Sequence, residues 1–205
     1  MLYFLPKINN IHINCELLQH IKLILFIYIL MACLNDCPKF DKKKNDYYTT
    51  KQMWDNIKHL VPQDKIIWEA CLLNSNSKSV EYWTELGYNC IGDNTIDCLK
   101  PNDLIYDMII TNIPFETKIK QKILRKFVEI DKPFITIMNV MNICAKYMRD
   151  IFKDKFGDLQ IIYPNGKIKF EVFEDGVFKK PKDPSFYCVY VAYKMNIDNE
   201  DLYLK

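Results

Sequence analysis

The run YDMIITNIPFE, Tyr106–Glu116, is the stretch on which the fold prediction rests. Apolar residues follow one another without alternation from Met108 to Ile110, which is typical of a strand buried on both faces in a parallel sheet. The run then breaks at the tetrapeptide Asn112-Ile113-Pro114-Phe115. This tetrapeptide is a working catalytic loop, a degenerate one, or an ordinary strand end with Phe115 packed in the core.

Helical and strand patterns alternate on both sides of this run. Residues 50–60 carry apolar side chains at helical spacing, and Gly87 follows a predicted helix over residues 78–86 in a usual cap position. The remaining predictions are strands over 65–70, 88–92, 134–139 and 185–195, helices over 117–130 and 142–156, and a hairpin around Asn165-Gly166 in residues 159–173. This order predicts an α/β domain, a Rossmann-like three-layer sandwich with a mostly parallel sheet and a C-terminal antiparallel hairpin.

Length and charge are compatible with one compact domain. The chain has 205 residues, of which 49% are apolar, and this is enough to fill a core. A formal net charge of +2 is close to balance, so no overall field indicates a nucleic-acid or acidic-membrane partner. Any basic surface is therefore expected to be local.

The N-terminal region differs from the rest. Leu23–Leu34 is an uninterrupted apolar dozen, too short for an ordinary membrane span, although it could be the core of a signal peptide. We interpret residues 1–30 as an extension preceding a true start at Met31, with a single domain over residues 31–205. A membrane-anchored domain held by residues 17–34 is the alternative if translation begins at Met1, and no membrane partner is otherwise expected.

The cysteines predict free thiols rather than a disulfide framework. Five of the eight lie singly in or beside apolar runs, which favours a reducing, cytoplasmic location; they are Cys71, Cys90, Cys98, Cys144 and Cys188. Cys33 and Cys37 form a lone C-x3-C without a second ligand pair, so no metal site is predicted. The sequence also lacks GxSxG, HExxH and phosphate-loop lysine motifs, which leaves hydrolase and nucleotidase functions without support.

Several short segments of the sequence, taken in order, resemble the motifs of a known enzyme family. They are DYYTT, IIWEA, LGYNCIGDN, YDMIITNIPFE, DKPFITIM and GKIKFE, within a span from about Asp46 to Met195. In this order the chain resembles the class I S-adenosylmethionine (SAM)-dependent amino-methyltransferases. It looks most like the DNA adenine methyltransferase-like proteins of large DNA viruses. The resemblance implies SAM as cofactor, DNA as partner and, if the protein is viral, a location in the host cytoplasm.

The resemblance also implies roles for the tetrapeptide. The Asn112 side-chain carbonyl and the Ile113 main-chain carbonyl would accept hydrogen bonds from an exocyclic amine, and Phe115 would stack on the flipped base. The family has proline where this chain has Ile113. Because that position contributes only its carbonyl, the substitution costs stiffness rather than a functional group. Pro114 matches the family pattern.

Four residues are implied at the cofactor. Glu69 would lie near its methionine end, Asp93 near the ribose and Asp97 near the adenine, while Thr49 belongs to a segment that closes over the cofactor in related enzymes. Thr49 or Thr50 could equally be only a helix N-cap, and Asp93 only a turn residue. The loop Cys71–Ser77 departs from the family because it has no glycine, and Leu72 and Leu73 could occupy the space of the cofactor.

A basic helix follows the tetrapeptide. Residues 117–130 predict an amphipathic helix with its lysines outward and Ile119, Ile123, Phe127 and Ile130 inward. Lys118, Lys120 and Lys122 are candidate phosphate contacts, although such a face is more often only solvated. The alternative to an active enzyme is an inactive methyltransferase fold that serves as a nucleic-acid-binding or virion-associated interaction module.

Overall fold

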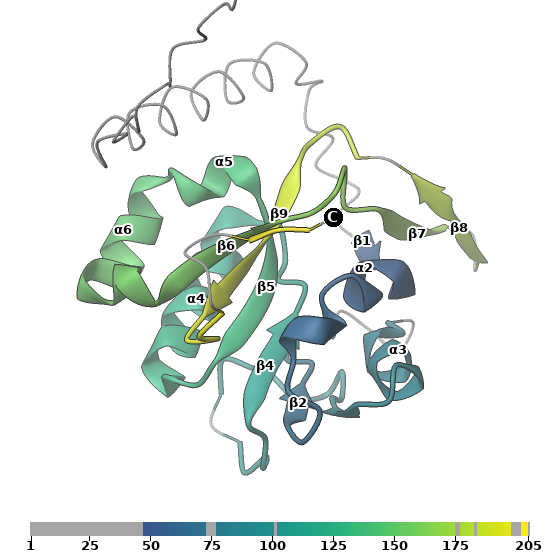
Figure 1. Cartoon of the computed structure of the whole chain (residues 1–205), viewed down its shortest axis with the longest axis horizontal. Helices are drawn as coiled ribbons and strands as arrows, with labels where there is room; N and C mark the ends of the chain where they lie inside the picture. The colour runs from purple at the N-terminus through teal and green to yellow at the C-terminus, as the bar shows by residue number, and fades with distance from the viewer. Residues whose placement is uncertain are drawn as a thin grey trace, which may run out of the picture. The chain divides into compact units, whose positions relative to one another are not determined.

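The computed structural model describes residues 47–72, 77–100, 102–174, 177–182, 184–197 and 202–204 (Figure 1). In chain order the elements are β1 (Tyr47–Thr49), α2 (Lys51–Asp55), the 3-10 helix η1 (Lys58–Leu60), β2 (Ile66–Trp68), α3 (Ser79–Glu85), β3 (Asn89–Ile91), β4 (Met108–Thr111), α4 (Thr117–Ile130), β5 (Phe134–Asn139), α5 (Val140–Ile143), α6 (Lys146–Phe152), the 3-10 helix η2 (Lys153–Asp158), β6 (Leu159–Tyr163), β7 (Phe170–Glu174), β8 (Val177–Lys182), β9 (Cys188–Tyr193) and β10 (Leu202–Tyr203).

The larger sheet has seven strands in the order β10-β6-β9-β5-β4-β2-β3. Strands β3, β2, β4 and β5 run parallel to one another, and β9 pairs antiparallel with both β5 and β6. All four residues of β4 and all six of β9 are buried, and for β4 this is what its unbroken apolar run predicts. The predicted Rossmann-like α/β fold with a mostly parallel sheet is confirmed.

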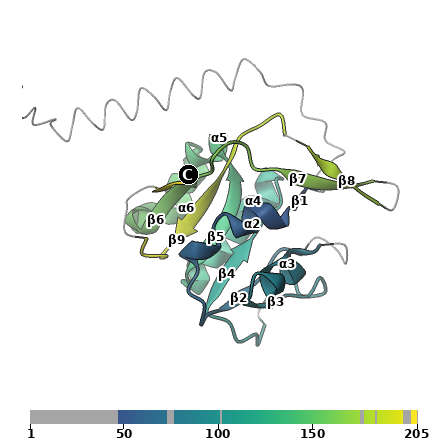
Figure 2. The same ribbon diagram turned by 45° about the vertical axis from the view of Figure 1, so that its right-hand side comes forward.

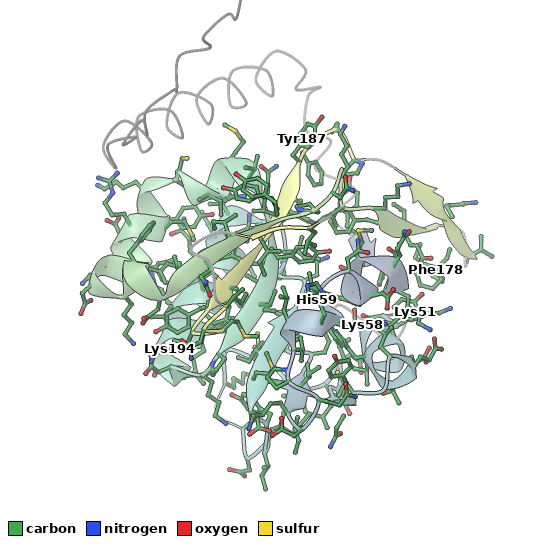
Figure 3. The ribbon with its side chains drawn as sticks, viewed as in Figure 1. Lys51, Lys58, His59, Phe178, Tyr187 and Lys194 are labelled. Carbon is green, nitrogen blue, oxygen red and sulfur yellow. The ribbon has the colours of Figure 1, made fainter. Side chains whose placement is uncertain are left out.

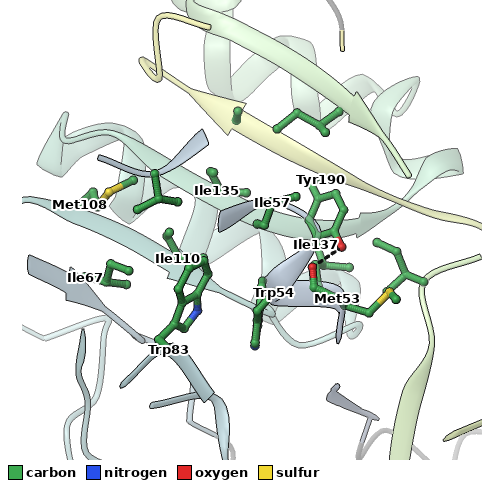
Figure 4. Packing of buried hydrophobic residues seen from close by; sticks show 14 of the residues in the cluster. Met53, Trp54, Ile57, Ile67, Trp83, Met108, Ile110, Ile135, Ile137 and Tyr190 are labelled. Atoms are coloured by element: carbon green, nitrogen blue, oxygen red, sulfur yellow. Dashed lines mark hydrogen bonds between the residues drawn. The ribbon is translucent and has the colours of Figure 1, made fainter. Parts of the chain in front are cut away.

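One face of the sheet packs against α2 and α3. Trp54 of α2 and Trp83 of α3 are fully buried and meet at a centroid distance of 5.7 Å, above residues of the central strands such as Ile110 and Ile137 (Figure 4). The Tyr190 hydroxyl of β9 donates to the carbonyl oxygen of Met53 at 2.7 Å, which ties α2 to the sheet across this core.

The opposite face packs against α4 and α6. Alternate residues of β5 point to this side, where Phe134 contacts Phe127 of α4 at 5.6 Å and Phe152 of α6 at 6.4 Å between ring centroids. The Phe134 ring also stacks on Tyr193 of β9 at 5.1 Å. Helices therefore cover both faces, which gives the predicted three layers.

A second, three-stranded sheet has the order β1-β7-β8, and both ribbon views place β7 and β8 to one side of the larger sheet (Figure 2). The antiparallel hairpin of this region is β7–β8, and the predicted hairpin over residues 159–173 is wrong. A turn does exist at Gly166, where φ is 93°, but the chain there passes from β6 of one sheet to β7 of the other.

Two predicted helices are interrupted. The segment 142–156 forms α5, α6 and η2, because Ala145 is extended (ψ 142°) and Lys153 has a φ of 40°. In the segment 50–60, α2 ends at Asp55 and a 3-10 turn follows, although Met53, Trp54 and Ile57 are buried together as predicted. No glycine or proline marks these breaks in the sequence.

The N-terminal extension, the Cys33–Cys37 pair and residues 73–76 of the predicted cofactor loop lie outside the described residues. Within the part of the chain that the structure describes, no helix has the length and apolar character needed to cross a membrane.

Gly92 allows the ends of β2 and β3 to pack closely. A methyl group built on Gly92 would lie 2.8 Å from the main-chain oxygen of Glu69 and 3.0 Å from Leu72 Cδ1. We therefore expect Gly92→Ala to lower the free energy of unfolding by about 2 kcal/mol, because backbone cannot yield as a flexible side chain can.

Urea denaturation measures this change. Gly157→Ala is the matched control, since nothing lies within 4 Å of a methyl group there and the variant should unfold like the wild type. Equal midpoints for the two variants would contradict the close approach at Gly92.

Candidate functional site at the carboxyl ends of β2 and β4

A pocket of about 40 Å³ lies where the carboxyl ends of β2 and β4 meet β1. Parallel strands of such sheets place their ligand sites at this edge. The lining comprises Tyr47, Tyr48, Thr49, Glu69, Cys71, Ser77, Ser79 and the tetrapeptide Asn112 to Phe115. The structure thus brings Thr49, Glu69 and the predicted catalytic tetrapeptide to one pocket.

Glu69 directly follows β2 and is buried, with 3% of its surface exposed. Its Oε1 accepts hydrogen bonds from the Thr111 hydroxyl and, at 3.3 Å, from the Cys71 main-chain N–H. Its Oε2 has no hydrogen-bond partner among the described residues. Burial raises the pKa of the carboxyl to about 7, against the opposing effects of the Thr111 hydroxyl, the Cys71 N–H and the nearby Ser79 hydroxyl.

Asn112 follows β4 with its two amide atoms in different situations. Its Nδ2 donates to the Tyr47 main-chain oxygen at 3.1 Å, and this bond to β1 fixes which way the amide is turned. Its Oδ1 is buried and has no partner in the described part of the chain. The result is an acceptor oxygen held in place beside the pocket and left available.

The Thr49 hydroxyl is a third buried polar group without a partner among the described residues. Thr49 closes β1, whereas Thr50 occupies the N-cap position of α2 without a side-chain capping bond. Unpaired buried polar atoms are uncommon because each carries a desolvation cost of about 1–3 kcal/mol. Three that line one pocket indicate a site made for a ligand with hydrogen-bond donors.

Phe115 is only partly available for stacking. Its ring lines the pocket but also makes edge contacts with Tyr47 at 5.6 Å and Phe170 at 5.8 Å between centroids. Ile113 is buried with 1% exposure, so its side chain belongs to the core. All four residues of the tetrapeptide line the pocket, and the contacts of Phe115 with Tyr47 and Phe170 are also those that an ordinary strand end would make, so the alternatives for the tetrapeptide stay predictions.

Aromatic residues also lie beyond the pocket lining. Phe178 of β8 contacts Tyr48 of β1 edge-on at 5.4 Å between centroids, and Lys78 Nζ lies 5.1 Å from the Phe178 ring (Figure 3). Tyr187, which precedes β9, is half exposed with Lys167 Nζ 4.7 Å from its ring.

Asp93 and Asp97 do not line the pocket. Asp93 is exposed and accepts from the Thr95 N–H at 2.7 Å, which lowers the pKa of its carboxyl. Asp97 accepts from the Leu99 N–H at 3.0 Å and faces Lys100 at 3.7 Å. Both are turn residues here, and their roles at a cofactor stay predictions.

The predicted outward orientation is wrong for Lys120. Lys120 is 2% exposed, with its Nζ 5.9 Å from the Phe115 ring, whereas Ile119 is exposed. Burial lowers the pKa of the Lys120 amine to about 8. The helix α4 has the predicted bounds, but its buried stripe is rotated to include Lys120 and Leu124, so Lys118 and Lys122 alone of the three candidates are exposed.

Some residues of the site were not predicted from the sequence. Thr111 fixes the Glu69 carboxyl, and Ser79 accepts from Trp54 Nε1 at 3.2 Å while lining the pocket. Thr111 adjoins Asn112, so its position at the strand end could have indicated from the sequence that it belongs to the site. No sequence feature indicates Ser79, because only the packing of α3 on α2 brings it to the pocket.

No protein-family model matches the chain. No curated protein matches its sequence either. Among solved structures, the chain is similar to magnesium protoporphyrin IX methyltransferase from Synechocystis with bound SAM, at 13% identity, 70% coverage of this chain, 79% of that chain and a TM-score of 0.39.

Two further similarities are of the same order. Precorrin-6y C5,15-methyltransferase from Geobacter metallireducens has 12% identity, 77% coverage of this chain, 100% of that chain and a TM-score of 0.39. A SAM-dependent O-methyltransferase from Thermotoga maritima has 11% identity, 69% and 63% coverage, and a TM-score of 0.32. Similarities this weak assign neither a substrate nor an activity to this chain.

The raised pKa of Glu69 predicts a pH-dependent stability. The carboxyl titrates near pH 4.3 when unfolded and at about 7 when folded, so folding favours its protonated form. The stabilisation of the folded protein by the protonated Glu69 carboxyl is complete below pH 4.3 and is lost as pH rises through 7. We expect it to lower the free energy of unfolding by up to about 3 kcal/mol between pH 4 and pH 8.

Denaturation of wild type and Glu69→Gln across this range isolates the effect, because all other groups are shared. The variant should gain stability relative to the wild type as pH rises. A difference that stays constant with pH would show that the carboxyl titrates as it does in water.

Proposed function

We propose that this protein is a SAM-dependent methyltransferase that acts on an exocyclic amine of a nucleic-acid base, adenine in DNA being the substrate the sequence resemblance favours. The observation that carries the proposal is that the buried Oδ1 of Asn112 and Oε2 of Glu69 lie in the same pocket and have no hydrogen-bond partner within the described part of the chain. These oxygens suit two different donors, an amine to be methylated and the ammonium group of an amino-acid cofactor.

Asn112 would activate the amine. An exocyclic amine of adenine is a weak nucleophile because its lone pair is delocalised into the ring. A hydrogen bond from the amine to Asn112 Oδ1 favours a pyramidal nitrogen, and the Ile113 main-chain oxygen would accept the second proton. The bond from Asn112 Nδ2 to Tyr47 keeps Oδ1 oriented before the substrate arrives.

Glu69 would hold the cofactor. When bound, SAM supplies an electrophilic methyl group on a sulfonium. A nearby ammonium group favours the ionised Glu69 carboxylate and would bring its pKa down from about 7. The ion pair between this carboxylate and the ammonium group then offsets the free-energy cost of burying the charged carboxylate. Glu69 therefore favours a cationic ligand over a neutral one.

The polar groups fit SAM, but the size of the pocket does not admit all of it. Small-molecule sites usually occupy about 300–1,000 Å³, far above the 40 Å³ between these residues. Leu72 packs against Gly92 at the ends of β2 and β3, the edge where the rest of such a ligand would extend. Binding therefore requires Leu72 to move.

The small size of the pocket also favours a second function, a methyltransferase fold without catalysis that serves as a nucleic-acid-binding or virion-associated interaction module. The exposed Lys118 and Lys122 on α4, next to the tetrapeptide, would then contact phosphates directly. Direct measurement of SAM binding separates the two functions.

Calorimetric titration with SAM, and with its demethylated product, should show binding that is tighter in Leu72→Ala than in the wild type by roughly tenfold, since the smaller side chain leaves space at Gly92. Ile105→Ala, at an exposed position, is the control and should match the wild type. No binding at millimolar SAM by either the wild type or Leu72→Ala would reject the enzyme and leave the interaction module.

Asn112→Ala should abolish methyl transfer to DNA while leaving SAM affinity within about twofold, because Oδ1 serves the amine and not the cofactor. Transfer of labelled methyl groups from SAM, measured beside the calorimetric affinity, gives both quantities. Asn89→Ala, on the exposed position of β3, is the control. Equal loss of transfer and affinity would show that Asn112 belongs to the cofactor site.

A further inference from the structure

Cys71 and Cys98 bring their sulfur atoms within 3.9 Å of each other. They are separated by 27 positions in the chain and come from different connections, Cys71 from the segment after β2 and Cys98 from the segment between β3 and β4. Both are free thiols, as are the other described cysteines. No third ligand completes a metal site with them among the described residues.

We propose that Cys71 and Cys98 form a reversible disulfide on exposure to a peroxide, and that this bond controls the backbone that holds Glu69. A disulfide requires a sulfur separation of about 2.05 Å, so the two atoms must approach by about 1.9 Å. Neither cysteine belongs to a paired strand, and their side chains can make this approach without breaking a sheet register.

The thiol pair has the chemistry for the reaction. The sulfur contact with Cys71 lowers the pKa of the Cys98 thiol, so Cys98 is the cysteine of the pair that ionises more readily. Cys98 is 7% exposed, which favours a small oxidant over a bulky disulfide, and Cys71 opens onto the pocket. Of the other described cysteines, Cys144 is exposed and Cys188 is buried in β9.

The reaction is balanced with one hydrogen peroxide. The Cys98 thiolate attacks one oxygen, the O–O bond breaks, and the leaving hydroxide takes a proton to give water and a sulfenic acid at Cys98. The Cys71 sulfur then attacks the Cys98 sulfur, the S–O bond breaks, and the Cys71 proton leaves with the hydroxide as a second water. Two electrons pass from the thiols to the peroxide, and a dithiol reductant reverses the change.

Cys71 connects this chemistry to the pocket. Its main-chain N–H lies 3.3 Å from Glu69 Oε1 and 3.1 Å from Thr111 Oγ1, so it is shared by the two groups that fix the buried carboxyl. Drawing Cys71 toward Cys98 moves this donor. Because this donor lowers the pKa of Glu69, the oxidised protein should lose more stability as pH rises than the reduced protein, and Glu69→Gln should remove the difference.

Peptide mapping of the full-length protein tests the proposal. Reduced protein is pulsed with hydrogen peroxide, unfolded in N-ethylmaleimide, digested with trypsin and analysed without reduction. We expect a peptide pair linked between Cys71 and Cys98 that disappears after dithiothreitol. Fragment ions must locate the bond, because the tryptic peptide that contains Cys98 also contains Cys90.

Two variants provide controls. Cys144→Ser removes an exposed cysteine elsewhere and should form the bond like the wild type, whereas Cys98→Ser should leave Cys71 unlinked. Recovery of both Cys71 and Cys98 as maleimide adducts, after a pulse that oxidises Cys144, would overturn the proposal. So would a bond from either cysteine to a different partner. The assay contains no SAM, so its outcome is independent of the proposed function.

Discussion

The Glu69 carboxyl is buried at the end of β2, where a hydrogen bond from the Thr111 hydroxyl joins it to the end of β4. Placing an ionisable group there is costly unless a partner compensates it, and the rise of its pKa to about 7 is the measure of that cost. The rest of the site is arranged around this group. Cys71 donates to it, and Gly92 allows the end of β3 to lie against its backbone.

The unpaired oxygens at this edge have a common physical meaning. A stable domain ordinarily satisfies its buried polar atoms, because each unsatisfied one subtracts from a small total stability. Among the described residues, Asn112 Oδ1, Thr49 Oγ1 and Glu69 Oε2 are exceptions that meet at one pocket. Trp83 Nε1 and Thr136 Oγ1 are also buried without a partner among these residues, but they do not line the pocket. The gathering of three such oxygens at one pocket favours a ligand site over imperfect packing.

Local patterns in the sequence predicted several elements well. The helix over residues 117–130 and the strand over 134–139 have the predicted bounds, since their periodicity is strong and their ends carry clear signals. The hairpin around Asn165-Gly166 was wrong for a physical reason. Asn-Gly predicts a turn correctly, but it does not decide which strands pair, because that depends on which strand has a free edge. In the structure β6 pairs with β9, whereas β7 pairs with β1.

By itself, the sequence determined the α/β alternation, the buried central strands and the placement of Glu69 and Asn112 at strand ends, because these follow from period and from chain order. Only the tertiary structure decided which neighbours those residues have. It turned Lys120 inward against Phe115, left Asp93 and Asp97 in exposed turns, and brought Cys71 to Cys98. Contacts between residues distant in sequence depend on how helices and loops pack on the sheet, and a local pattern carries no record of that packing.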